Sequence, residues 1–204
     1  MRCTVSLFTG LVVLSGCVFR SADAPRFFRP GSVTLDAAAS NEATAPAKGE
    51  IPVRLRAVRS EPFLRERIVW RVSEVEYGLY EERRWIDLPA HYVQDALRTR
   101  LRETPGLRLT DDPRAPALHV DVLAFDDVLR PAHEANVALV IALDDAARGR
   151  LLTRTFDARV GIENDEPASM AKAMGEALDD AVAQVAEAVR SSLQPHRPSS
   201  ARQR

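Results

Sequence analysis

The sequence predicts an α+β domain in which a mainly antiparallel or mixed sheet is covered by two helices, the second long and C-terminal. Alternating apolar and polar residues, the period of a strand, fill most of the middle of the chain. Two segments instead repeat apolar residues every three or four positions, the period of a helix, and each follows a group of strands. Hairpin-linked strands with two helices on one face form a two-layer α+β fold.

The period-two pattern places the strands. Ile51, Val53 and Leu55 alternate with polar residues or proline, and Pro52 lies at the start of its strand, where a missing amide is tolerated. The expected strands are 32–36, 51–58, 67–72, 74–80, 107–110, 117–129, 135–145 and 151–162, and an Asp-Asp-Pro turn at 111–113 follows the fifth of them. Residues 135–145 are apolar on both faces, as in a central strand, and residues 144–150 with Gly149 form a hairpin turn.

The first helix is predicted over 87–103. Val93, Leu97 and Leu101 repeat at i, i+4 and i+8 and form one apolar stripe. Asp87 is the expected N-cap, and Pro89 lies in the first turn.

The second helix is predicted over 166–193. Asn164 or Asp165 is the expected cap, and Pro167 lies in the first turn. Met170 and Met174 belong to its apolar stripe, and we expect them in the core rather than in a lipid-binding surface.

Aromatic and charged residues before the first helix have two interpretations each. Trp85 is expected to fill the core where strand turns into helix, with a partner surface as the alternative, and Trp70 is also expected in the core. Residues 81–84, Glu-Glu-Arg-Arg, fit a solvated strand edge better than a docking rim. Phe27 and Phe28 fit a membrane interface and a first strand equally well.

The N-terminus has the features of a secretory signal. A basic start precedes an apolar run from Val5 to Leu14, which is too short to span a bilayer as a helix. Leu14, Ser15, Gly16 and Cys17 then resemble the lipobox of bacterial lipoproteins, which implies cleavage before Cys17 and acylation of its thiol. Val18 after the cysteine lacks the inner-membrane retention signal of enteric lipoproteins, which points to the outer membrane.

Composition excludes several classes of protein. The formal net charge of -1 does not suggest a nucleic-acid partner. The only cysteines are Cys3 and Cys17, so the mature chain would have neither a disulfide nor a cysteine metal site. There is no phosphate-binding loop, dinucleotide fingerprint or hydrolase elbow, and no cofactor is expected.

Histidines and acidic pairs are weak candidates for catalysis. His91, His119, His133 and His196 show no metal-ligand spacing, so structural or solvent roles are favoured. Four Asp-Asp pairs occur, at 111–112, 126–127, 144–145 and 179–180. Neighbouring strand residues point to opposite faces, so the pairs are poor acid/base dyads, and the first and third fit turns. The prediction is that the protein is not an enzyme.

A resemblance to a family follows from these motifs in order. The lipobox, the strand-rich stretch, the segment "YEERRWIDLPAHYVQDALRTRLRE" and the Ala-rich last helix resemble the ABC-type transport auxiliary lipoproteins. The matching residues of the family motif, whose role is structural or partner docking, are Trp85, Asp87, Leu88, Pro89, Leu97 and Leu101. The chain departs from the family at its first strand, because Phe27 and Phe28 lie farther upstream of Thr34 than the family's paired tyrosines do.

The resemblance implies an outer-membrane lipoprotein that faces the periplasm and serves as adaptor for an MCE-type lipid transporter. Its partners would be an MCE-domain tunnel protein and, through it, an inner-membrane permease and ATPase; a homo-oligomer is compatible with the symmetry of such partners. The alternatives are a carrier that itself holds an acyl chain and an envelope hydrolase. The expected organisation is a lipoprotein signal peptide (1–16), a lipidated tether (17–31), the family domain (32–193) and a disordered basic tail (194–204).

Overall fold

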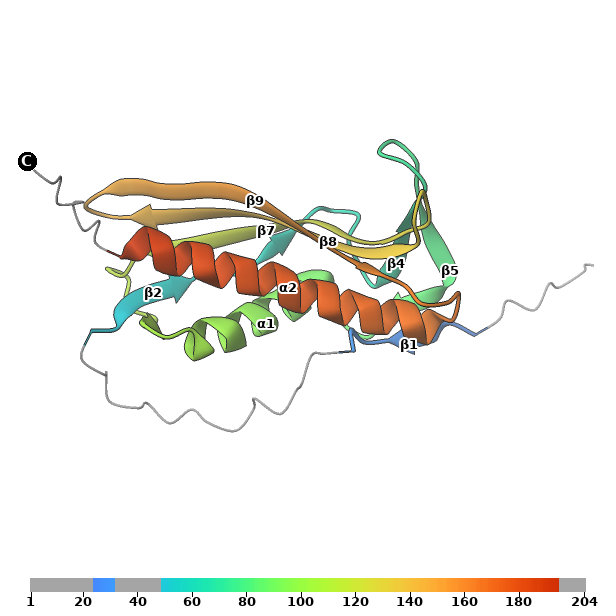
Figure 1. Cartoon of the computed structure of the whole chain (residues 1–204), viewed down its shortest axis with the longest axis horizontal. Helices are drawn as coiled ribbons and strands as arrows, with labels where there is room; N and C mark the ends of the chain where they lie inside the picture. Colours follow the sequence, from blue (N-terminus) through green and yellow to red (C-terminus); the bar gives the residue numbers. More distant parts are fainter. Residues whose placement is uncertain (1–23, 32–48, 195–204) are drawn as a thin grey trace, which may run out of the picture.

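The computed structural model describes residues 24–31 and 49–194. They form one mixed sheet of nine strands and two helices, α1 (Pro89–Glu103) and α2 (Pro167–Leu193). Both helices lie on the same face of the sheet, and α2 runs along most of its length (Figure 1). The predicted fold class is confirmed.

Strand β7 (Ala117–Val128) organises the sheet. On one side it pairs antiparallel with β8 (Glu134–Asp145), which pairs antiparallel with β9 (Gly149–Gly161). Along its other side lie three short parallel strands in succession, β2 (Ile51–Leu55), β3 (Arg59–Ser60) and β4 (Arg67–Arg71). The sheet is completed by β5 (Tyr77–Trp85) antiparallel to β4, β1 (Arg26–Phe28) parallel to β5, and β6 (Leu107–Leu109) parallel to β2.

Two predicted strands differ from the observed ones by three residues or more at one or both ends. The strand expected over 51–58 ends at Leu55, because the chain bends there before β3 pairs with a later part of β7. The strand expected over 74–80 begins only at Tyr77 and continues to Trp85, so the charged residues 81–84 lie inside a strand. The hairpin turn at Gly149 is confirmed: its φ is +76°, and Asp145 Oδ1 accepts hydrogen bonds from two turn amides.

Both helices begin within two residues of the predicted starts, but the predicted caps are wrong. The N-cap of α1 is Leu88, because the Asp87 carboxylate accepts from the Leu88 amide at 2.7 Å instead of from an amide inside the helix. The N-cap of α2 is Glu166, and neither cap residue makes a side-chain capping bond. Pro89 and Pro167 do occupy the first turns, as predicted.

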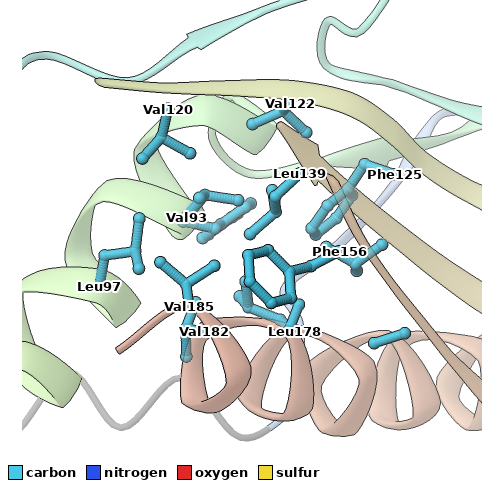
Figure 2. Packing of buried hydrophobic residues seen from close by; sticks show 14 of the residues in the cluster. Val93, Leu97, Val120, Val122, Phe125, Leu139, Phe156, Leu178, Val182 and Val185 are labelled. Carbon is cyan, nitrogen blue, oxygen red and sulfur yellow. The ribbon is translucent and has the colours of Figure 1, made fainter. Parts of the chain in front are cut away.

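The core fills the space between the helices and the sheet. Figure 2 shows side chains from α1, α2, β7, β8 and β9 pointing toward one another. Val93 and Leu97 on α1 meet Val182 and Val185 on α2, beneath Leu139 of the sheet. Met170 and Met174 are fully buried, as expected.

The N-terminal segment joins the fold earlier than predicted. Strand β1 pairs with β5 ahead of the expected boundary at residue 32, and the Gly31 amide donates to Ala171 O of α2 at 2.9 Å. Phe27 and Phe28 both lie in β1, as the strand interpretation predicts; Phe28 packs against the core, whereas Phe27 is exposed. The strand predicted over 32–36 lies outside the described residues.

Candidate docking surface

The predicted lipidation site lies outside the described residues, as do Leu14, Ser15 and Gly16. Within the described ranges, no helix is long and apolar enough to cross a membrane. The same ranges contain no group of three or more His, Cys, Asp or Glu residues arranged to hold a metal ion.

The family-motif residues form the corner between β5 and α1. Trp85 is buried and packs edge-on against Phe125 and Tyr92, with ring centroids 5.4 and 6.3 Å away. Of the other motif residues, Leu97 and Leu101 are buried, Leu88 caps α1, and Asp87 is exposed and pairs with His91 Nδ1 at 2.7 Å. The bonds from the Leu88 amide and His91 outweigh partial burial and lower the pKa of Asp87. Trp85, Leu97 and Leu101 therefore belong to the core at this corner, while Asp87 lies at the surface.

Trp70 is not a core residue, contrary to expectation. It is half-buried and its ring lies across Gly78, its partner on β5. A Cβ at Gly78 would lie only 2.0 Å from the indole ring, so the ring occupies the place of the missing side chain.

Asp127, a member of the second Asp-Asp pair, is completely buried. Tyr80 Oη donates to its Oδ2 at 2.8 Å, and His133 Nε2 lies 2.9 Å from its Oδ1. Burial, reinforced by the negative charge of Asp127, raises the pKa of Tyr80 far above its usual range, so the phenol stays a donor. Among the described residues, no hydroxyl or thiol is hydrogen-bonded to His133, and the hydroxyl of Tyr80 is bonded to Asp127 instead.

Asp126 is buried on the other face of β7. Its Oδ1 accepts from Asn136 Nδ2 at 2.9 Å, and its Oδ2 lies 2.8 Å from Arg71 Nε. Burial raises the pKa of Asp126, and the bond from Asn136 and the charge of Arg71 only partly offset it. The two aspartates thus serve separate polar clusters and do not form a dyad, as the alternation of strand side chains predicts.

An apolar groove beside Asp126 is the candidate functional site. It lies on the sheet face away from the helices, encloses about 500 Å³, and is lined by Glu61, Phe63, Val69, Tyr77, Gly78, Leu79 and Leu123. Phe63, Tyr77, Leu79 and Leu123 are each 36–47% exposed. Clusters of large exposed apolar side chains mark contact sites for partners or lipids more often than ordinary surface.

A β-bulge brings Leu123 into the groove. In β7, Val122 pairs with Leu139 and Ala124 with Ala138, which leaves Leu123 as an extra residue. A bulge of this kind redirects one side chain and restarts the alternation behind it. Leu123 is therefore turned outward, while Val122 and Phe125 stay in the core.

The groove has a firm base. Val69, which lines it, lies opposite Asp126 in the sheet, and the Arg71 guanidinium packs 5.8 Å from the centroid of the Tyr77 ring. Phe63 meets Tyr77 edge-on, with centroids 6.2 Å apart. The buried ion pair and the aromatic contacts hold the groove side chains in place.

The groove also adjoins an open strand edge. Strand β5 pairs with β4 on one side, but on its other side β1 covers only Arg83–Trp85. Among the described residues, the outer edge of 77–82 thus has no strand partner, which agrees with the predicted edge at Glu81 and Glu82. Such an edge can accept a further strand, and the charges of Glu81 and Glu82 limit which strands can pair there.

Comparison with known sequences identifies the protein's family. A sequence profile described as "ABC-type transport auxiliary lipoprotein component" matches residues 34–186, three-quarters of the chain. The chain belongs to this family. It is thus related to lipoproteins that accompany ABC transporters, as the resemblance implied, and that relation implies transporter partners. No curated protein sequence matches it.

Solved structures show the same fold at low sequence identity. A crystal structure of a Xanthomonas campestris protein has a TM-score of 0.64 at 16% identity, covering 72% of this chain and 89% of its own. A second, of an uncharacterised protein, has a TM-score of 0.59 at 16% identity, covering 82% and 99%. These likenesses concern the fold alone.

Sequence reasoning missed the groove as a site. The strand expected over 74–80 contains Tyr77 and Leu79, but Phe63 lies in a turn and Leu123 is the extra residue of a bulge that was not expected. The sequence feature that could have indicated the groove is the alternation of apolar residues at 75–79, next to the expected strand edge at 81–84.

Proposed function

We propose that this protein is an outer-membrane lipoprotein that faces the periplasm and acts as a non-enzymatic adaptor of an MCE-type lipid transporter. Acyl chains on Cys17 hold it at the bilayer, and the groove of β4, β5 and Leu123 binds the MCE-domain partner. Membership of the auxiliary lipoprotein family supports the transporter link. The lipobox and Val18 support the anchor and its destination.

The apolar groove is the observation that carries the adaptor role. Its four exposed apolar side chains stand on a sheet fixed by the buried Arg71–Asp126 pair, so they need little ordering when a partner binds. A segment that placed apolar residues in the groove could also pair its backbone with residues 77–82. We propose that the partner contributes such a segment.

A site-specific crosslinking experiment tests the docking surface. A photo-crosslinking residue replaces Leu79 in the acylated protein in its native envelope, and a matched variant carries it at Gln184, an exposed position on α2. We expect an adduct with an MCE-domain protein at position 79 and none at 184. Equal adducts at both positions, or none at 79, would remove the groove from the proposal.

The anchor has its own test. Metabolic labelling with palmitate should mark the wild-type protein and not Cys17→Ala, because the thiol is the acylated group in lipoproteins of this type. More than one acyl chain is needed for stable attachment. Label that persists in Cys17→Ala would contradict the lipidation site.

A carrier role is the second candidate, and the groove volume favours it. About 500 Å³ with an apolar lining falls within the range of sites for small ligands. A carrier would bind one fluorescent fatty acid per chain and lose it on Leu123→Glu. An adaptor would show no saturable binding, so this titration separates the two candidates.

A further inference from the structure

A second surface, separate from the groove, lies where β1 joins the sheet. Cross-strand pairing there sets arginines against one another: Arg26 lies opposite Arg83, and Arg84 lies opposite Arg67. Like charges placed directly opposite each other in a sheet are unfavourable. Because successive strand residues alternate, Arg26 and Arg83 lie on one face of the sheet and Arg67 and Arg84 on the other. With Arg29 immediately after β1, five arginines flank this edge from both faces.

These arginines have no carboxylate partner. Of the described carboxylates, none lies within 4.0 Å of any of the five guanidinium groups, although Glu66, Glu81 and Glu82 are close in the chain. Some arginines elsewhere on the sheet have a partner: Arg59 pairs with Asp121 at 2.7 Å, and Arg159 pairs with Asp157 at 3.0 Å. The edge at β1 differs because its arginines lack a carboxylate and also lie opposite one another in the sheet. This arrangement suits an external anion.

Two large apolar side chains accompany the cluster. Phe27 on β1 is 59% exposed and Ile86, just after β5, is 54% exposed. The Ile86 amide donates to Phe28 O at 2.9 Å, so both belong to the same edge of the fold. Exposed apolar residues among arginines are typical of surfaces that lie at a bilayer interface.

The position of the cluster indicates which anion it meets. Arg26 follows Cys17 by nine positions, so even a fully extended chain keeps β1 within about 32 Å of an acylated thiol. The edge formed by β1 is thus the described part of the sheet closest in sequence to the anchor.

We propose that this edge docks on a bilayer that carries anionic phospholipid headgroups. The proposal rests on the proposed function, since the acylated Cys17 delivers the edge to the membrane. The guanidinium groups meet the headgroup phosphates, while Phe27 and Ile86 enter the interface. Strands β4 and β5 belong to both surfaces, so docking would also set the height of the groove above the bilayer.

Vesicle flotation tests the proposal without the acyl anchor. The protein for this assay comprises residues 17–204 and carries Cys17→Ser. It keeps every described element but lacks the apolar signal segment and the thiol that would be acylated. The probes are phosphatidylcholine vesicles with and without phosphatidylglycerol. We expect roughly tenfold tighter binding to the anionic vesicles, weakened by high salt.

Matched variants assign the effect to the edge. Arg26→Glu with Arg67→Glu should lower the affinity for anionic vesicles about tenfold, and Phe27→Ser with Ile86→Ser should lower it to a similar extent. All four positions are exposed, and far-ultraviolet circular dichroism checks that the variants fold. The control, Arg114→Glu with Val75→Ser, changes an exposed arginine and an exposed apolar residue elsewhere and should leave binding unchanged.

Three outcomes would overturn the proposal: no binding to either vesicle, equal binding to both, or equal loss in the control. Failure of palmitate labelling at Cys17 would instead remove the anchor and leave the vesicle result standing, so the two failures can be told apart.

Discussion

The two faces of the sheet differ in what covers them, and β7 contributes to both. On the helix-covered face its Leu118, Val120 and Val122 are buried under α1 and α2. On the open face the bulge turns Leu123 toward the groove, and β4 and β5 add further exposed apolar side chains. The covered face supplies stability, whereas the open face keeps apolar surface available for binding.

The largest expected effect on stability comes from removing a large side chain from the helix-covered face of the sheet. Trp85→Ala should lower the free energy of unfolding by about 4 kcal/mol, because it leaves a cavity against Phe125 and Tyr92. Leu79→Ala, on the open face, should cost less than about 1 kcal/mol. Urea unfolding measures both, and equal losses would mean that the two faces contribute alike to stability.

Asp126→Ala should come next, at about 3 kcal/mol. The substitution leaves Arg71 half-buried without its carboxylate and Asn136 without its acceptor. The same urea titration measures the loss. An effect below about 1 kcal/mol would show that water replaces the carboxylate, and that the base of the groove is less firm than the structure indicates.

Gly78→Ala probes the packing on the helix side of β5. The new methyl group would collide with the Trp70 ring, so we expect a loss of about 2 kcal/mol in the free energy of unfolding. Gly161→Ala is the matched control, because its methyl group would meet nothing within 4 Å. If both variants melt at the same temperature, Trp70 is free to move away from Gly78.

The smallest expected effect is a pH dependence. The pKa of Asp126 in the folded protein lies above its ordinary value of 3.8, so between these two values the folded state holds more protons than the unfolded chain. Stability from this group therefore falls as the pH rises through that window. Asp126→Asn lacks the titration, so the unfolding free energy of wild type minus that of the variant should decrease from pH 4 to pH 7. A difference that is constant or increasing would contradict the raised pKa.

Local patterns were sufficient for the helices and the long hairpin. Period 3.6 with Pro89 and Pro167 near the start placed both helices within two residues, and alternation placed β8 and β9 closely. The caps were wrong because Asp87 binds the next amide and the ring of His91 rather than an amide inside the helix. A cap depends on side-chain rotamers, which residue type alone does not specify.

The candidate site was much less predictable. The partners of Asp126 come from β4 and β8, and the groove combines a turn, two neighbouring strands and a bulge in a third. The alternation of apolar and polar residues expected for 117–129 did not predict that Leu123 is the extra residue of a bulge. The resemblance to a lipobox could be recognised because its residues are contiguous, and acylation of Cys17 remains a prediction.

The sequence by itself determined the order of the helices and the longer strands, the place of Trp85 at the strand-to-helix corner and the resemblance to the family, because these depend on motifs of residues close together in the chain. Only the tertiary structure decided which strands lie parallel to β7 and which aspartates are buried. It also decided that an apolar groove lies on the open face of the sheet and an arginine-rich surface at its β1 edge. These features arise from pairing between distant segments, where a bulge or a one-residue change of register moves a side chain from the core to the solvent.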